Sequence, residues 1–113
     1  ENVSALAGIH VTNVHLNGDG TGWKVAKASE TVKTQTVNGK TVKFFVGVPG
    51  TMQLVQPSNG SESETGTASF GENDICIPSG GEKTLEFAVE RGAFTETTAS
   101  AKAFSMTLDF AFN

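Results

Sequence analysis

The last ten residues, 104–113, alternate between large apolar and polar or small side chains. This pattern constrains the fold more than any other stretch of the sequence. A period of two indicates a β-strand, because successive side chains of a strand point to opposite faces. One face of this strand must pack against an apolar layer, which ties the end of the chain into a sheet. The apolar positions are Phe104, Met106, Leu108, Phe110 and Phe112.

Shorter segments with β-strand character recur in the first half of the chain. Apolar residues at positions 9, 11, 14 and 16 predict a strand whose alternation slips by one residue at a bulge. A short strand follows around Trp23. Asn38-Gly39 lies between β-forming arms at 32–37 and 40–48, which predicts a hairpin with a two-residue turn.

Three further strands are expected at 51–55, 75–77 and 83–91, whereas the polar segment 56–72 reads as a surface loop. No segment has the period of an amphipathic helix. About seven short strands with regularly spaced turn signals are typical of an immunoglobulin-like β-sandwich. We therefore expect an all-β protein with a single domain over residues 1–113.

Composition narrows the classes of function. The chain has 113 residues, of which 37% are hydrophobic, and 12 acidic residues outnumber 8 basic ones for a net charge of −4. An acidic chain without a basic stripe disfavours nucleic-acid binding. No apolar run approaches the roughly 18 residues of a membrane span. The sequence starts without Met or an apolar leader, which is expected of a mature, processed protein or a trimmed one.

The sequence gives no support for catalysis, a metal or a cofactor. His10 and His15 lie in the bulged strand and could meet Asp19 or Asp109 around a metal, but two ordinary surface imidazoles are the simpler interpretation. No serine has a positioned base, and no pair of carboxylates stands out. Cys76 lies between two isoleucines and is interpreted as a small hydrophobic residue, with a reactive or intermolecular thiol as the alternative.

The strand rhythm, the segments 20–25 and 99–113, and the aromatic penultimate Phe112 resemble fimbrial subunits of the chaperone–usher class. The resemblance is greatest to the atypical Saf, Sef and afimbrial-adhesin invasin subunits. Many pilins carry a disulfide and a penultimate Tyr, and this chain has neither. The resemblance implies a sandwich that lacks one strand and is completed by a donor strand. A periplasmic chaperone fills the groove first, and the N-terminal extension of a neighbouring subunit then replaces it.

On this resemblance, the apolar residues of segment 104–112 would line the donor-strand groove. The alternating N-terminal residues Val3, Ala5, Ala7, Ile9 and Val11 would form a donor segment, 1–11. Residues 9–16 are also needed as the first strand of the sandwich, so both roles for this region remain open, as do a shaft and a tip position in the fibre.

The expected function is therefore that of a structural or adhesive subunit of a bacterial surface fimbria. Such a subunit would be exported through the periplasm with a chaperone and an usher, would assemble by donor-strand exchange, and would attach to a host receptor or glycan. One alternative is a self-contained carbohydrate-binding β-sandwich in which Trp23 stacks on a sugar. Another is an immunoglobulin-like spacer module of a larger surface protein. The fimbrial hypothesis requires an incomplete sheet, and both alternatives require a complete one.

Overall fold

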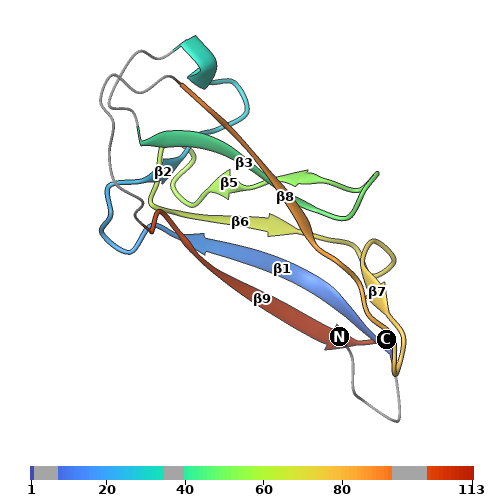
Figure 1. Ribbon diagram of the computed structural model, residues 1–113. Helices are drawn as coiled ribbons and strands as arrows, with labels where there is room; N and C mark the ends of the chain where they lie inside the picture. The colour runs from blue at the N-terminus through green and yellow to red at the C-terminus, as the bar shows by residue number, and fades with distance from the viewer. Residues whose placement is uncertain (2–7, 35–39, 93–101) are drawn as a thin grey trace.

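The computed structural model describes residues 1, 8–34, 40–92 and 102–113, which form two β-sheets packed face to face (Figure 1). The first sheet contains β1 (Ile9–Asn17), β5 (Gln56–Pro57), β6 (Thr65–Ser69), β7 (Cys76–Ile77) and β9 (Ser105–Phe112). The second contains β2 (Lys24–Val25), β3 (Thr41–Gly47), β4 (Gln53–Leu54) and β8 (Glu86–Arg91). A single 3-10 turn, η1 (Val32–Thr34), is the only helical element in the described part. The expected all-β sandwich is confirmed, with more strands than predicted.

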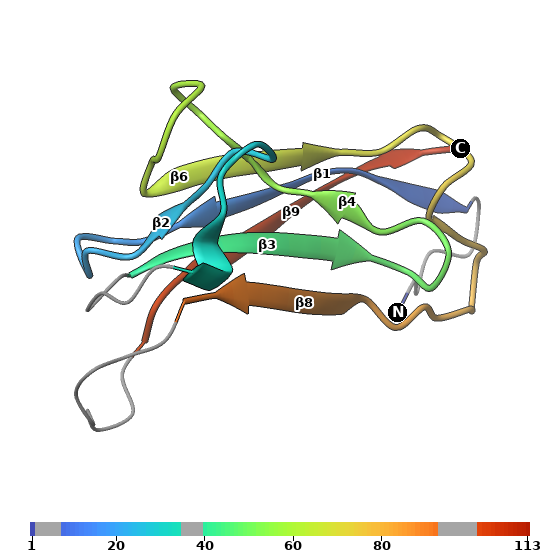
Figure 2. The same ribbon diagram turned by 90° about the horizontal axis from the view of Figure 1, so that it is seen from above.

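Each sheet has one long central strand. β1 pairs with β6 and β7 along one side and with β9 along the other. β3 pairs with β2 and β4 along one side and with β8 along the other. Within the described residues, β8 and β9 therefore pair along one side only, and they are edge strands of different sheets. Figure 2 shows that the two strands diverge towards the end of β9.

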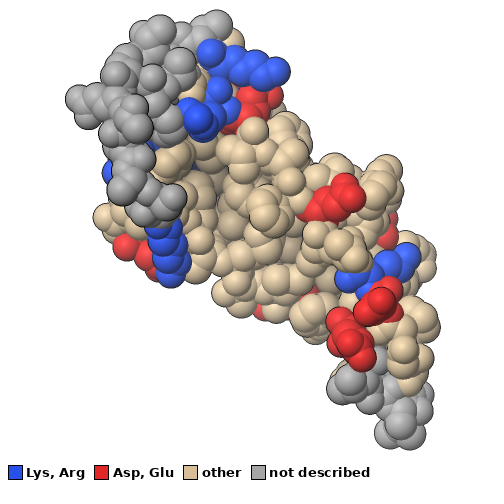
Figure 3. All heavy atoms as spheres, viewed as in Figure 1, with Lys and Arg blue, Asp and Glu red and all other residues tan. Residues whose placement is uncertain are grey.

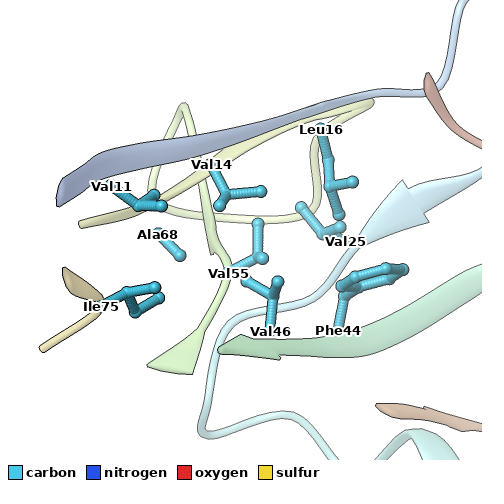
Figure 4. Close-up of a cluster of buried hydrophobic side chains, with 9 residues drawn as sticks. All are labelled: Val11, Val14, Leu16, Val25, Phe44, Val46, Val55, Ala68 and Ile75. Carbon is cyan, nitrogen blue, oxygen red and sulfur yellow. The ribbon is translucent and has the colours of Figure 1, made fainter. Parts of the chain in front are cut away.

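The core lies between the two central strands, where branched aliphatic side chains from both sheets meet (Figure 4). β1 supplies Val11, Val14 and Leu16 from one layer, and β3 supplies Phe44 and Val46 from the other. Burying such side chains contributes about 1.5–3 kcal/mol each before the entropy cost of ordering them. The clustered residues are Val11, Val14, Leu16, Val25, Phe44, Val46, Val55, Ala68 and Ile75.

The predicted strands at both ends of the chain are confirmed. The register between β1 and β9 shifts between Val11 and Asn13, which is the bulge that the slipped alternation predicts. Because of this shift, Val11 and Val14 both face the core although they are three residues apart. Opposite them, Phe110 and Leu108 of β9 lie on the same inward face.

The predicted hairpin at 32–48 is wrong in its first arm. Residues 32–34 form η1, and the Asn38-Gly39 turn lies outside the described residues. The start of β3 is already paired on both sides, because Val42 lies between Val25 of β2 and Arg91 of β8. Val32, the first residue of η1, is fully buried, so this turn packs against the rest of the protein.

The predicted surface loop at 56–72 is also wrong, because it contains β5 and β6. β6 pairs with five consecutive residues of β1 and places Gly66 and Ala68 inward. A Cβ at Gly66 would lie 2.8 Å from side-chain atoms of both Val25 and Val55. The inward positions are small because the core approaches the strand so closely, and this gives the segment a polar composition that resembles a loop.

The proposed donor segment requires a correction. Ile9 and Val11 belong to β1 of the chain's own sandwich, where Val11 is buried in the core, so they are not part of a free segment. The remaining donor residues, Val3, Ala5 and Ala7, lie outside the described residues. In the described part of the chain, no helix has the length and apolar character to cross a membrane.

Candidate functional site

A groove runs between the two edge strands, and we call it the β8–β9 groove. It encloses a volume of about 340 Å³ with a predominantly apolar lining. In Figure 3, the surface of this side of the molecule is largely free of charged groups between β8 and β9. The walls are formed by Phe87, Val89, Arg91, Ala103, Phe104 and Met106. The floor is formed by Leu16, Trp23, Val42 and Phe44.

Strand pairing explains why these side chains face the groove. Phe87 and Val89 pair with Val46 and Phe44 of β3, whose side chains are in the core, so they point to the same inner face. Met106 pairs in the same way with the buried Leu16 of β1. Both edge strands thus turn their apolar face towards the space between the sheets.

Aromatic rings organise the deeper part of the groove. Phe44 stacks on Phe87 with ring centroids 5.7 Å apart, and its edge contacts Phe104 at 6.1 Å. Trp23 packs edge-to-face against Phe104 at 6.3 Å. These offset and T-shaped arrangements are the favoured geometries of aromatic pairs. Trp23 is thus half-buried at the groove.

Four large apolar side chains of the two edge strands remain exposed to solvent, and two of them, Phe87 and Val89, line the groove. The exposed fraction is 64% for Phe87, 49% for Val89, 50% for Phe110 and 72% for Phe112. Phe104, Met106 and Leu108 are half-buried and pack against the core. All five apolar residues predicted for the last strand lie on one face, and their exposure is greatest at the end of the chain.

The opposite face of β9 is joined to β1 by polar side chains. His15 donates from Nε2 to Oδ2 of Asp109 at 2.7 Å, and its Nδ1 lies 3.1 Å from Thr67 Oγ1 on β6. His10 donates from Nδ1 to Oδ1 of Asn113 at 2.6 Å. The backbone amide of Asn113 donates to the carbonyl of Gly8, so the end of the chain is fastened to the start of β1.

The residues that were considered as metal ligands make hydrogen bonds to other side chains. His15 and Asp109 do meet, but His10 bonds to Asn113 and Asp19 accepts a hydrogen bond from Ser105. Within the described ranges, no group of three or more His, Cys, Asp or Glu side chains lies close enough to hold a metal ion. The half-buried Cys76 donates from Sγ to the carbonyl of Glu72 at 3.0 Å.

Of the five residues of the last strand that were predicted to line a groove, Phe104 and Met106 do so, whereas Leu108, Phe110 and Phe112 are not part of its lining. The second wall is β8, which lies in the strand expected at 83–91 and in which the apolar residues Leu85, Phe87 and Val89 alternate with other residues. Phe87 and Val89 face inward, but they are exposed because no strand lies beyond β8 in the described part. The alternation therefore shows which face of β8 is apolar. It does not show that β8 is an edge strand, because that depends on the order of the strands in the sheet.

The site rests on the geometry of this chain. Comparisons of the sequence and structure with protein families, curated proteins and solved structures found no match.

Proposed function

We propose that the β8–β9 groove accepts a β-strand from another polypeptide, and that the protein is a structural or adhesive subunit of a bacterial surface fimbria assembled by donor-strand exchange. The observation that carries the proposal is that both strands bordering an apolar groove have one unpaired side within the described residues. These unpaired sides support the proposal, because the fimbrial hypothesis requires an incomplete sheet.

The physics of the groove favours an added strand over a rigid small ligand. An unpaired strand edge presents rows of backbone N–H and C=O groups that another strand can satisfy. A strand also places a side chain towards the groove at every second residue, so alternating apolar residues would match its predominantly apolar lining. Phe87 and Val89 line the groove and are exposed, so an added strand would cover them.

The partners follow from the resemblance. Before assembly, the donor would be a strand of a periplasmic chaperone. In the fibre, the donor would be an N-terminal extension of a neighbouring subunit delivered through an usher, and a host receptor or glycan would be bound at the cell surface. Ile9 and Val11 are part of β1, so these two residues would not belong to a segment that this chain donates. Both a tip position and a shaft position are compatible with the proposal.

The alternatives are less well supported by the geometry. A carbohydrate-binding sandwich would need an exposed aromatic platform, whereas Trp23 is half-buried against Phe104. A spacer module would need a complete sheet on each side of the core, whereas β8 and β9 expose Phe and Val side chains on their inward faces.

The test is the addition of synthetic strands to the isolated protein. One peptide copies residues 1–11, a second has a generic alternating apolar sequence, and a third is its scramble. An acceptor groove predicts that an alternating peptide raises the urea midpoint and protects the amides of β8 and β9 from hydrogen exchange, and that the scramble does neither.

Substitutions in β8 localise the effect. Phe87→Ser should weaken peptide binding, because Phe87 lines the groove, whereas Ala88→Ser on the opposite face of the same strand should leave it unchanged. If neither alternating peptide changes stability or exchange, donor-strand assembly is rejected.

A further inference from the structure

The residues of β8 that point away from the groove form an acidic margin. Glu86 and Glu90 alternate with Phe87 and Val89, and they are directed to the outer face of the second sheet. Glu90 pairs across the sheet with Lys43, but the Nζ of Lys43 donates to the carbonyl of Ala28 at 2.8 Å. Within the described residues, neither Glu86 nor Glu90 has a cation within ion-pair distance.

The other charged groups near the groove that the structure describes form no ion pair with Glu86 or Glu90. On β9, the outward-facing charged residue is Asp109, which bonds to His15. Lys102 precedes β9 and lies 3.5 Å from Asp19. Arg91 lines the groove at the far end of β8, and its Nη1 donates to the carbonyl of Gly92. In the described residues, the outer margin beside Phe87 and Val89 therefore carries two carboxylates without an ion pair, and Lys43 lies opposite Glu90 on the side away from an added strand.

A strand added to β8 would bring its own outward side chains beside these carboxylates. Side chains directly opposite each other on paired strands lie about 4.5–5.5 Å apart at Cβ. Opposite charges at such positions attract, and like charges repel. Glu86 and Glu90 are four residues apart, so they would lie beside two outward positions of the incoming strand that are also four residues apart.

We propose that the groove selects a strand of another polypeptide with apolar residues facing inward and Lys or Arg at two outward positions four residues apart. This inference rests on the proposed function, because it specifies the partner of the same groove. Residues 1–11 contain Glu1 and no Lys or Arg, so this segment of a second copy lacks the complementary charge. The selected partner is thus a different, basic strand.

The experiment uses three labelled peptides with identical inward residues and with Lys, Gln or Glu at the two outward positions. Each peptide is long enough to pair with the six residues of β8. Fluorescence anisotropy measures the dissociation constants at low and high salt. We expect the Lys peptide to bind on the order of tenfold more tightly than the Glu peptide at low salt, with the Gln peptide between them. High salt should reduce the difference.

Charge reversal in the protein tests whether Glu86 and Glu90 cause the preference for the Lys peptide. The double variant Glu86→Lys/Glu90→Lys should prefer the Glu peptide. The control Glu64→Lys/Glu72→Lys makes the same change in net charge away from β8 and should keep the original preference. Circular dichroism establishes that both variants fold.

The outcomes separate the two proposals. Equal binding of the Lys and Glu peptides, a preference unchanged by the β8 reversal, or the same reversal in the control would overturn charge selection while leaving the strand-accepting groove intact. Failure of all three peptides to bind would overturn both. Equally tight binding of the peptide that copies residues 1–11 would identify a second copy as the partner instead.

Discussion

β6 and β9 both pair with β1, but their inward side chains differ in size and in burial. On β6, the inward residues are Gly66 and Ala68, and both are buried. On β9, the inward residues include Phe110 and Phe112, and half or more of each side chain is exposed. Hydrophobicity alone would predict the reverse order. Burial is instead decided by what lies over each strand.

The closed side is covered by the loop and strands that connect the two sheets. Val25 pairs with Ser63 across the gap between the sheets, and Val25 and Val55 pack directly over Gly66. On the open side, β8 and β9 face each other without pairing in the described part of the chain. Large apolar side chains gathered at such an edge are expected of an interaction surface.

The largest expected effect contrasts a closed-side core residue with an open-side one. Ile75→Ala removes a fully buried side chain and should lower the free energy of unfolding by about 2–5 kcal/mol. Phe112→Ala removes a larger side chain that is mostly exposed, and it should change stability by no more than about 0.5 kcal/mol. Urea titration of both variants measures the difference, and similar losses would contradict the comparison.

A second contrast adds volume instead of removing it. Gly66→Ala should cost about 1–3 kcal/mol, because the new methyl group meets Val25, Val55 and the carbonyl of Gln56 at 2.8 Å. The matched change Ala103→Val adds methyl groups to the wall of the open groove, where solvent leaves room. Thermal unfolding should therefore show a lower midpoint for the first variant alone.

The polar contacts on the outer face of β9 should contribute less to stability than the packing of Ile75 or the close contacts at Gly66. A double-mutant cycle with His15→Gln and Asp109→Asn should give a coupling free energy of about 0.2–1 kcal/mol, because both side chains are roughly half exposed. A larger coupling would mean that β9 is held mainly from its polar face, and inward packing would then matter less than the open-side comparison assumes.

The smallest effect concerns the loops on the closed side. Burial raises the pKa of Glu30 above its usual range, and a hydrogen bond and charge repulsion from Glu62 raise it further, while Lys27 and Lys43 act in the opposite direction. Because the folded-state pKa is raised, the associated stability is present at acid pH and is lost as pH rises through that pKa.

Glu30→Gln should therefore stabilise the protein at neutral pH by about 0.2–0.5 kcal/mol and have no such advantage at acid pH. Urea midpoints of both proteins across this range measure the change. A constant difference at all pH values would show that the carboxyl pair is not its source.

Several features follow from local pattern and were predictable. The alternation in 104–112 and the slipped alternation in 9–16 are properties of neighbouring residues, and both strands form where expected. The all-β class follows for the same reason. In contrast, the segment containing Gly66 and Ala68 has no alternation of large apolar residues, so its local pattern predicts a loop where the paired strand β6 forms.

The groove shows where local pattern stops being informative. The sequence alone determined that the chain forms strands, that one face of its last strand is strongly apolar, and that its surface is acidic overall. Only the tertiary structure decided that β8 and β9 end up at the edges of two different sheets, with Phe87 opposite the apolar face of β9. The reason is physical: alternation sets which face of a strand is apolar, whereas exposure depends on long-range pairing. That pairing is determined by the packing of all the strands together.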